Sequence, residues 1–163
     1  MVFPVAASSK ECLVKFYGAS TGGSLLRGWN AQFDDGQDLQ AFSLDFLLYD
    51  KLLNKKSVFL IDVEGAEFEV IKGAKNIVRD SDSIFCIEIP CCQFMPDENF
   101  NKNFQNIFNF FEINGYDFWE ISDTGNLSPL TINIVNDYIS LQRFDGIMAL
   151  FKKNSNALGN SLC

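Results

Sequence analysis

The 163-residue sequence contains no histidine. Enzymes that activate a serine or cysteine nucleophile with an imidazole base are therefore excluded, as are zinc sites that depend on imidazole ligands. Any acid–base chemistry must come from carboxylates, tyrosine, lysine or cysteine. A catalytic site in this chain, if present, is expected to rely on its acidic residues.

Basic residues are also few, with 13 lysines and arginines against 21 aspartates and glutamates and a formal net charge of −8. Proteins that bind nucleic acids or anionic membranes use lysine and arginine to neutralise phosphates. We therefore expect no nucleic-acid partner. A small or neutral molecule, or a metal cation, fits the charge better.

Long apolar runs are absent as well. No segment approaches the roughly eighteen apolar residues of a membrane-spanning helix, and the first residues lack the pattern of a signal peptide. The five cysteines form no Cys-x-x-Cys pair, and their odd number argues against a disulfide framework. These features predict a protein without a membrane span, located in the cytoplasm.

The apolar pattern predicts an α/β protein of about one domain. Residues 58–61, VFLI, form a continuous apolar run of the kind that a strand buried on both faces requires. After Gly65 the apolar period becomes helical up to Val78, and residues 84–87 then form a second buried strand. Strand, helix and strand in about thirty residues indicate a βαβ unit.

Other elements follow from the same criteria. A helix is predicted from Ser43, which is suited to be its N-cap. The clearest amphipathic helix spans Phe100 to Phe111, with Asp97 as the expected cap and Gly115 as the stop. Further strands are expected at residues 1–7, 12–17, 116–121 and 146–151, and a mobile polar tail at residues 152–163.

Four acidic residues lie at the end of the first predicted buried strand: Asp62, Glu64, Glu67 and Glu69. In open α/β sheets, ligands bind at the carboxyl ends of the strands. Because alternate residues of an extended backbone face the same side, Asp62 and Glu64 can point into one crevice. Glu67 and Glu69 have a second explanation, since acids in the first turn of a helix favour its dipole.

The run FLIDVEGAEFEVIKGA, followed by SIFCIEIP, resembles the motif of FkbM-type methyltransferases. In that motif a strand ending in Asp-x-Glu-Gly-Ala-Glu leads into a helix closed by Lys-Gly-Ala and then into a strand ending in an acidic residue. The segments VFPVAAS, AFSLDFLL and INGYDFWEI resemble further parts of the family in the same order. The likeness spans residues 2–151, so residues 1–151 are interpreted as a partial FkbM-type domain.

This resemblance implies a methyltransferase that uses S-adenosylmethionine and has a Rossmann-like sheet, mostly parallel with an antiparallel C-terminal strand. Its implied acceptor is a hydroxyl group on a sugar, a lipid or a small metabolite. Asp62 and Glu64 would be the catalytic residues that orient or deprotonate this hydroxyl, with a bound metal cation as a possible aid. Glu67 and Glu88 would lie on the substrate side.

The sequence departs from the family at its N-terminal half. It lacks the first strand with its glycine-rich loop for the methionine portion of the donor, and the second strand with its ribose-binding acid. No cofactor-binding residue is therefore assigned, and we do not expect this chain alone to transfer methyl groups. We interpret it as a fragment, a split protein or a rearranged remnant.

Without those two strands, the strands at residues 2–7 and 58–61 would lie about 14 Å apart. Either the first strand pairs elsewhere, or a partner chain or upstream segment supplies the missing strands, or the edge of the second strand lies open.

Two alternatives remain. Asp62 and Glu64 have the ligand type that Mg²⁺ or Mn²⁺ prefers, as in a metal-dependent glycosyl or phosphoryl transferase. The absence of a phosphate-binding loop counts against this reading. The chain would otherwise be a non-catalytic interaction module that uses an exposed strand edge.

Overall fold

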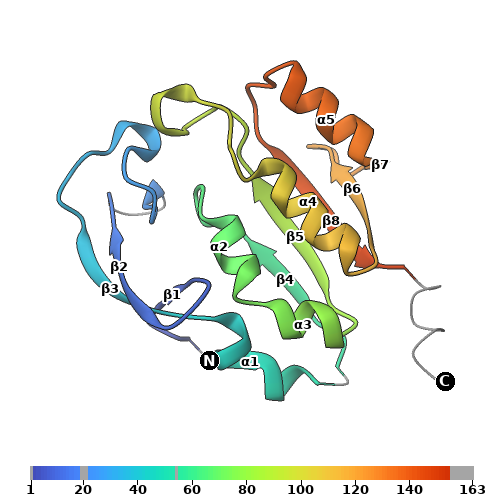
Figure 1. Cartoon of the computed structure of the whole chain (residues 1–163), viewed down its shortest axis with the longest axis horizontal. Helices are drawn as coiled ribbons and strands as arrows, with labels where there is room; N and C mark the ends of the chain where they lie inside the picture. The colour runs from blue at the N-terminus through green and yellow to red at the C-terminus, as the bar shows by residue number, and fades with distance from the viewer. Residues whose placement is uncertain (1, 19–21, 54, 155–163) are drawn as a thin grey trace.

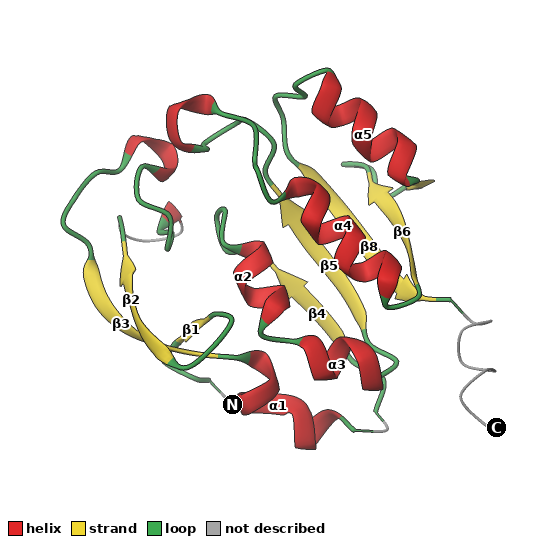
Figure 2. Cartoon of the chain, in the orientation of Figure 1, coloured by secondary structure: helices red, strands yellow, loops and turns green. Residues whose placement is uncertain are grey.

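The computed structural model describes residues 2–18, 22–53 and 55–154, which form an α/β fold with two sheets (Figure 2). The smaller sheet has the order β1 (Ala6–Ala7), β3 (Gln37–Phe42), β2 (Cys12–Phe16). The larger has the order β4 (Val58–Ile61), β5 (Ile84–Ile89), β8 (Ile147–Lys153), β6 (Tyr116–Ile121), β7 (Leu127–Pro129). The described α-helices are α1 (Leu44–Leu52), α2 (Glu67–Lys72), α3 (Lys75–Asp80), α4 (Phe104–Ile113) and α5 (Ile132–Ser140).

The directions of the strands in the larger sheet place two strand ends side by side. β4 and β5 run parallel, with Ile61 opposite Ile87, whereas β8 runs antiparallel to both β5 and β6. In a parallel pair the carboxyl ends lie at the same edge of the sheet. The acidic residues that follow β4 therefore lie beside the end of β5.

The core lies between the larger sheet and the helices in front of it, which are α2, α3 and α4 in the view of Figure 1. Phenylalanine dominates this core: Phe85, Phe108, Phe111 and Phe151 are fully buried. The rings of Phe111 and Phe151 stack with their centroids 4.1 Å apart. The 17 phenylalanines of the sequence thus include a connected aromatic cluster, which contributes both apolar burial and ring contacts.

The prediction that residues 58–61 are buried on both faces is wrong. Phe59 packs against Phe85 in the core, but Val58 and Leu60 are 70% and 73% exposed. The side chains of a strand alternate between faces, and here the helices cover only the face of Phe59. Among the described residues β4 pairs with β5 alone. Its other edge therefore lies open, which is one of the three arrangements expected from the sequence.

The smaller sheet shows where the first predicted strand pairs. Ala6 lies opposite Ala41 of β3, in parallel, so this strand pairs outside the larger sheet, which was another of the expected arrangements. Of the predicted range 1–7, residues 2–7 are described, and only Ala6–Ala7 among these form a strand. β3 is not predicted from the sequence, because its segment QDLQAF has little apolar character.

The helix predicted after Gly65 is interrupted at Gly73, which separates α2 from α3. A Cβ at position 73 would lie 2.1 Å from the carbonyl oxygen of Ser8, so the close approach of the β1 end requires glycine there. The Ser43 cap is confirmed, since its hydroxyl accepts a hydrogen bond from the Phe46 amide at 3.2 Å.

The expected Asp97 cap is wrong. Asp97 lies in the short 3₁₀ helix Pro96–Glu98 with a φ of 55°, and α4 begins only at Phe104. Buried Asn101 accounts for the later start, because its side chain donates to the Pro90 carbonyl at 3.0 Å and accepts from the Asn103 amide at 2.9 Å. These bonds hold the chain in a turn before the helix.

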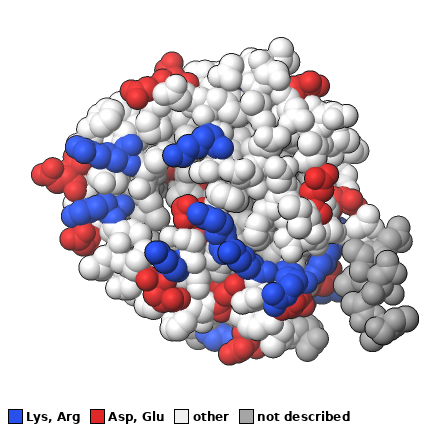
Figure 3. All heavy atoms as spheres, viewed as in Figure 1, with Lys and Arg blue, Asp and Glu red and all other residues white. Residues whose placement is uncertain are grey.

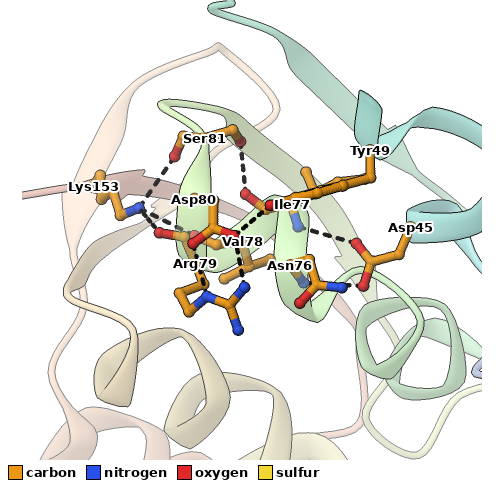
Figure 4. A network of polar contacts seen from close by, with 9 residues as sticks. All are labelled: Asp45, Tyr49, Asn76, Ile77, Val78, Arg79, Asp80, Ser81 and Lys153. Atoms are coloured by element: carbon orange, nitrogen blue, oxygen red, sulfur yellow. Dashed lines mark hydrogen bonds and ion pairs between the residues drawn. The ribbon is translucent and has the colours of Figure 1, made fainter. Parts of the chain in front are cut away.

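Residues far away in the sequence cap both ends of α3 (Figure 4). At its start, the Asp45 carboxylate of α1 accepts hydrogen bonds from the amides of Asn76 and Ile77 at 2.9 and 3.0 Å. At its end, Lys153 Nζ of β8 donates to three carbonyl oxygens at 2.6 to 3.2 Å. These belong to Val78, Arg79 and Ser81.

Lys152 and Lys153 are thus part of β8 and not of a tail. The rest of the predicted tail, from residue 155, lies outside the described residues.

Two surface properties bear on possible partners. Within the described ranges, none of the helices has the length and apolar character needed to cross a membrane. On the helical face drawn in Figure 3, positive and negative side chains are interspersed over the described part of the chain.

Candidate active site

The candidate site begins with two carboxylates on neighbouring strands. Asp62 directly follows β4, and Glu88 lies near the end of β5. Because Ile61 is opposite Ile87, the next residues along both strands, Asp62 and Glu88, are also neighbours. Both side chains are exposed, and their mutual repulsion contributes to a raised pKa of Glu88, after the larger effect of burial.

The chain turns sharply after Asp62. Glu64 and Gly65 both have left-handed backbone conformations, with φ values of 53° and 96°. The Ser24 hydroxyl donates a hydrogen bond to the Glu64 carbonyl at 2.5 Å. The Trp29 ring lies so close to Gly65 that a Cβ there would be 2.9 Å from two ring atoms. The connection between β2 and β3 therefore covers the turn, and position 65 requires glycine.

Glu67 supports the same turn from the other side. Its side chain is only 1% exposed, and its Oε1 accepts a hydrogen bond from the Gly65 amide at 2.8 Å. Burial raises the pKa of Glu67 to about 7, and the charges of Asp62 and Glu64 act in the same direction. Glu67 is the most strongly buried acid of the site.

A cavity of about 40 Å³ joins these residues. Four of the acids singled out in the sequence line it, together with residues from three other segments. The lining consists of Asp62, Glu64, Glu67, Glu88, Trp29, Pro90, Gln93, Phe94 and Gly146. A space of this size holds about one water molecule, so a larger ligand must bind in the adjoining spaces.

Glu64 has the environment of a proton acceptor. Burial raises its pKa, the charges of Asp62 and Glu88 add to this effect, and a hydrogen bond from Trp29 acts in the opposite direction. A carboxylate with a raised pKa is a stronger base at neutral pH than an ordinary one.

Glu69 does not belong to the site. Its carboxylate accepts hydrogen bonds from Lys72 Nζ at 2.5 Å and from the Ser9 hydroxyl at 2.9 Å. Partial burial raises its pKa, but these hydrogen bonds and the charge of Lys72 lower it overall. Glu69 thus links α2 to the turn after β1, which agrees with a structural role.

Two of the larger spaces that adjoin the small cavity reach its acids. One, of about 370 Å³, touches Asp62 and Val63 and lies against the smaller sheet. The other, of about 570 Å³, touches Glu88, Gln93 and Gly146 and extends to Arg143. A cavity of about 690 Å³ beside β6 contains none of the four acids.

The 570 Å³ cleft is predominantly acidic. Glu88, Glu120, Asp123 and Asp145 line it, against the single basic residue Arg143. Arg143 is already paired with Glu120 at 2.8 Å. An anionic ligand would therefore meet net negative charge.

Four residues that shape the site are not predicted from the sequence: Ser24, Trp29, Gln93 and Phe94. Ser24 lies in the connection between β2 and β3, of which residues 19–21 lie outside the described part of the chain. Trp29 and Phe94 contact each other with ring centroids 6.0 Å apart. No local pattern marks these residues, because their role depends on loops that meet only in the folded chain.

Among the described residues, no group of three or more cysteine, aspartate or glutamate side chains is arranged to hold a metal ion. Asp62 and Glu64, the possible ligands suggested by the sequence, are thus not joined by a third such side chain in the described structure.

Comparison with known proteins adds one family. A family model, the methyltransferase FkbM domain, matches residues 2–118, which include all of β4, α2, β5 and the four acids of the cavity. No curated protein and no solved structure matches the chain. Because the family model covers well over half of the 163 residues, the chain belongs to the FkbM methyltransferase domain family.

Proposed function

We propose that this chain forms the acceptor side of an S-adenosylmethionine-dependent methyltransferase that methylates a hydroxyl group of a sugar, lipid or small metabolite. The observation that carries the proposal is the convergence of Asp62, Glu64 and Glu88 at the carboxyl ends of β4 and β5. Ligands of open α/β sheets bind at this location. Membership of the FkbM family supplies the type of reaction.

The proposed roles follow from position and charge. When bound, S-adenosylmethionine supplies a methyl group attached to a positively charged sulfur. Glu64 accepts the proton of the acceptor hydroxyl, which its raised pKa favours, and exposed Asp62 orients that hydroxyl. Glu88 faces the 570 Å³ cleft, which we assign to the rest of the acceptor. Trp29 and Phe94 exclude water from the turn.

The residues present fit only one part of the donor. The carboxylates of Asp62 and Glu64 favour a cationic sulfur, and the 370 Å³ space beside Asp62 adjoins them. The described residues have no glycine-rich loop after a buried strand that would hold the methionine and ribose portions. We propose that a partner chain or an upstream segment pairs with the free edge of β4 and supplies these portions of the site.

The exposed apolar side chains of Val58 and Leu60 support this completion of the sheet. Edge strands of soluble proteins are usually short, charged or covered. A second segment that pairs with β4 and covers its exposed face would bury both side chains.

The proposal is tested by adding S-adenosylhomocysteine to the ¹⁵N-labelled chain and following its amide signals by NMR. We expect weak, millimolar binding that shifts the amides of residues 62–65 and is lost in Asp62→Asn combined with Glu64→Gln. Glu69→Gln is the matched control, because Glu69 lies outside the cavity. Absence of any shift at these amides would overturn the proposed site, and micromolar binding would contradict the missing donor half.

The alternative of a metal-dependent transferase is tested by measuring the melting temperature with added metal ions. An increase in melting temperature with Mg²⁺ or Mn²⁺ that disappears in Asp62→Asn, without any effect of S-adenosylhomocysteine, would favour a metal-dependent transferase. The interaction-module alternative shares the exposed β4 face with our proposal. It would be favoured if a partner bound at β4 and the strand-end carboxylates had no effect on any ligand.

A further inference from the structure

Glu67 differs from the other acids of the cavity in what its carboxyl group contacts. Asp62 and Glu88 are exposed and Glu64 is partly exposed, whereas Glu67 is 1% exposed and bonded to the Gly65 amide. Its carboxyl group is thus directed at the backbone of the turn that presents the neighbouring acids. Glu67 lines the cavity as well, but this hydrogen bond engages its carboxyl group with the backbone.

The turn needs such support because its backbone is strained. A glutamate with a φ of 53° occupies the left-handed region, which costs a non-glycine residue about 1 kcal/mol or more. Such a conformation persists only where surrounding contacts determine it. Three contacts converge here: the Ser24 hydroxyl on the Glu64 carbonyl, the Trp29 ring on Gly65, and Glu67 on the Gly65 amide.

A favourable interaction with the dipole of α2 does not by itself explain why the Glu67 carboxyl group is buried. Glu67 is the first residue of α2, and an acid there interacts favourably with the helix dipole even when it is exposed to water. Burying a carboxyl group costs free energy, as the raised pKa of Glu67 indicates. The burial is explained if the Gly65 amide requires a hydrogen-bond acceptor, which the Glu67 carboxyl group provides.

We propose that Glu67 is a positioning residue, whose buried carboxyl group holds the Glu64–Gly65 turn in the conformation that presents Asp62 and Glu64 to the cavity and Gly65 to Trp29. It acts through the Gly65 amide and does not touch the substrate. The inference deepens the proposed function and rests on it for the task of Asp62 and Glu64. The position of the turn itself can be measured without donor or acceptor.

Two substitutions separate hydrogen bonding from charge. Glu67→Gln keeps a side-chain oxygen that can accept from the Gly65 amide, and Glu67→Met has similar volume without an acceptor. Glu69→Gln is the control, because it removes a charge from the same helix outside the cavity. Hydrogen exchange of the Gly65 amide is followed by NMR, and exchange of the β6 and β8 amides reports whether each variant is folded.

We expect Glu67→Met to speed the exchange of the Gly65 amide about tenfold, the effect of losing one hydrogen bond, and Glu67→Gln to change it less than about threefold. The pKa of Glu64 provides a second measure, obtained from the NMR chemical shift of its carboxyl carbon as a function of pH. The midpoint of this titration should fall towards the ordinary value in Glu67→Met, because burial is the main cause of its elevation, and stay raised in Glu67→Gln.

Emission of Trp29, measured in a Trp119→Phe background, should shift to longer wavelength in Glu67→Met alone. The proposal is overturned if folded Glu67→Met leaves the Gly65 amide and the Glu64 midpoint as in the wild type. It is also overturned if Glu67→Gln changes both as much as Glu67→Met does, because charge and not the hydrogen bond would then be essential. If Glu67→Met does not fold, the proposal is overturned when Glu67→Gln, which keeps the acceptor, speeds Gly65 exchange about tenfold and lowers the Glu64 midpoint. None of these outcomes depends on binding of S-adenosylhomocysteine, so failure of the proposed function is seen separately.

Discussion

Replacing Glu67 by glutamine should change how the stability of the protein depends on pH. The carboxyl group is fully buried, and burial is the main cause that raises its pKa from 4.5 to about 7. A group whose pKa is raised on folding stabilises the folded state fully below its unfolded pKa. That contribution is lost as the pH rises through the folded pKa.

The magnitude follows from the same values. At 1.36 kcal/mol for each pKa unit, a rise from 4.5 to about 7 corresponds to about 3 kcal/mol of stability lost between pH 4.5 and pH 7. Glutamine cannot ionise, so Glu67→Gln should lack this loss. Between pH 4.5 and pH 8, the unfolding free energy of the wild type should therefore fall by about 3 kcal/mol more than that of the variant.

Urea unfolding of both proteins at several values between pH 4.5 and pH 8 measures this difference, with tryptophan emission as the signal. Glu69→Gln is the control, and should not reduce the loss of stability, because the pKa of Glu69 is lowered and not raised. If the wild type and Glu67→Gln keep the same difference in unfolding free energy from pH 4.5 to pH 8, the assignment of a buried, titrating Glu67 is wrong.

Three further predictions concern the scaffold. Asp45→Ala should lower the unfolding free energy by about 1 kcal/mol, because α3 loses its cap, whereas Asp50→Ala on the same helix should change it by less than about 0.5 kcal/mol in the same urea assay. Lys153→Met should cost about 1–3 kcal/mol, since three carbonyl oxygens at the end of α3 lose their donor, and a melting curve unchanged from the wild type would contradict this. Leu60→Gln should change stability by less than about 0.5 kcal/mol, because the side chain is 73% exposed, but should weaken self-association or partner binding seen by light scattering.

The βαβ unit and the acidic strand end were predictable because their signals are local. Apolar runs at residues 58–61 and 84–87 coincide with β4 and β5, and the acids that follow line one cavity. The helix cap at Ser43 was predictable for the same reason, since a cap depends on residues within one turn.

The errors have a common cause in contacts between distant segments. The helix after Gly65 is interrupted where Ser8 approaches Gly73. The start of α4 is delayed by the contact of Asn101 with Pro90. The exposure of Val58 and Leu60 results from the lack of a cover on one face of β4 in the described structure. An apolar run shows that burial is favourable but does not show which layers are present.

The α/β class, the resemblance to FkbM methyltransferases and the position of the acids at a strand end follow from the sequence alone, because strand periods and motif spacings are properties of neighbouring residues. The contacts of each acid follow from the folded chain instead. Glu67 and Glu69 are two residues apart, but Glu67 lies under Gly65 while Glu69 pairs with Lys72 and Ser9. The physical reason is burial: the free energy of a carboxyl group depends on solvent exposure and hydrogen-bond partners, which arise when distant segments meet.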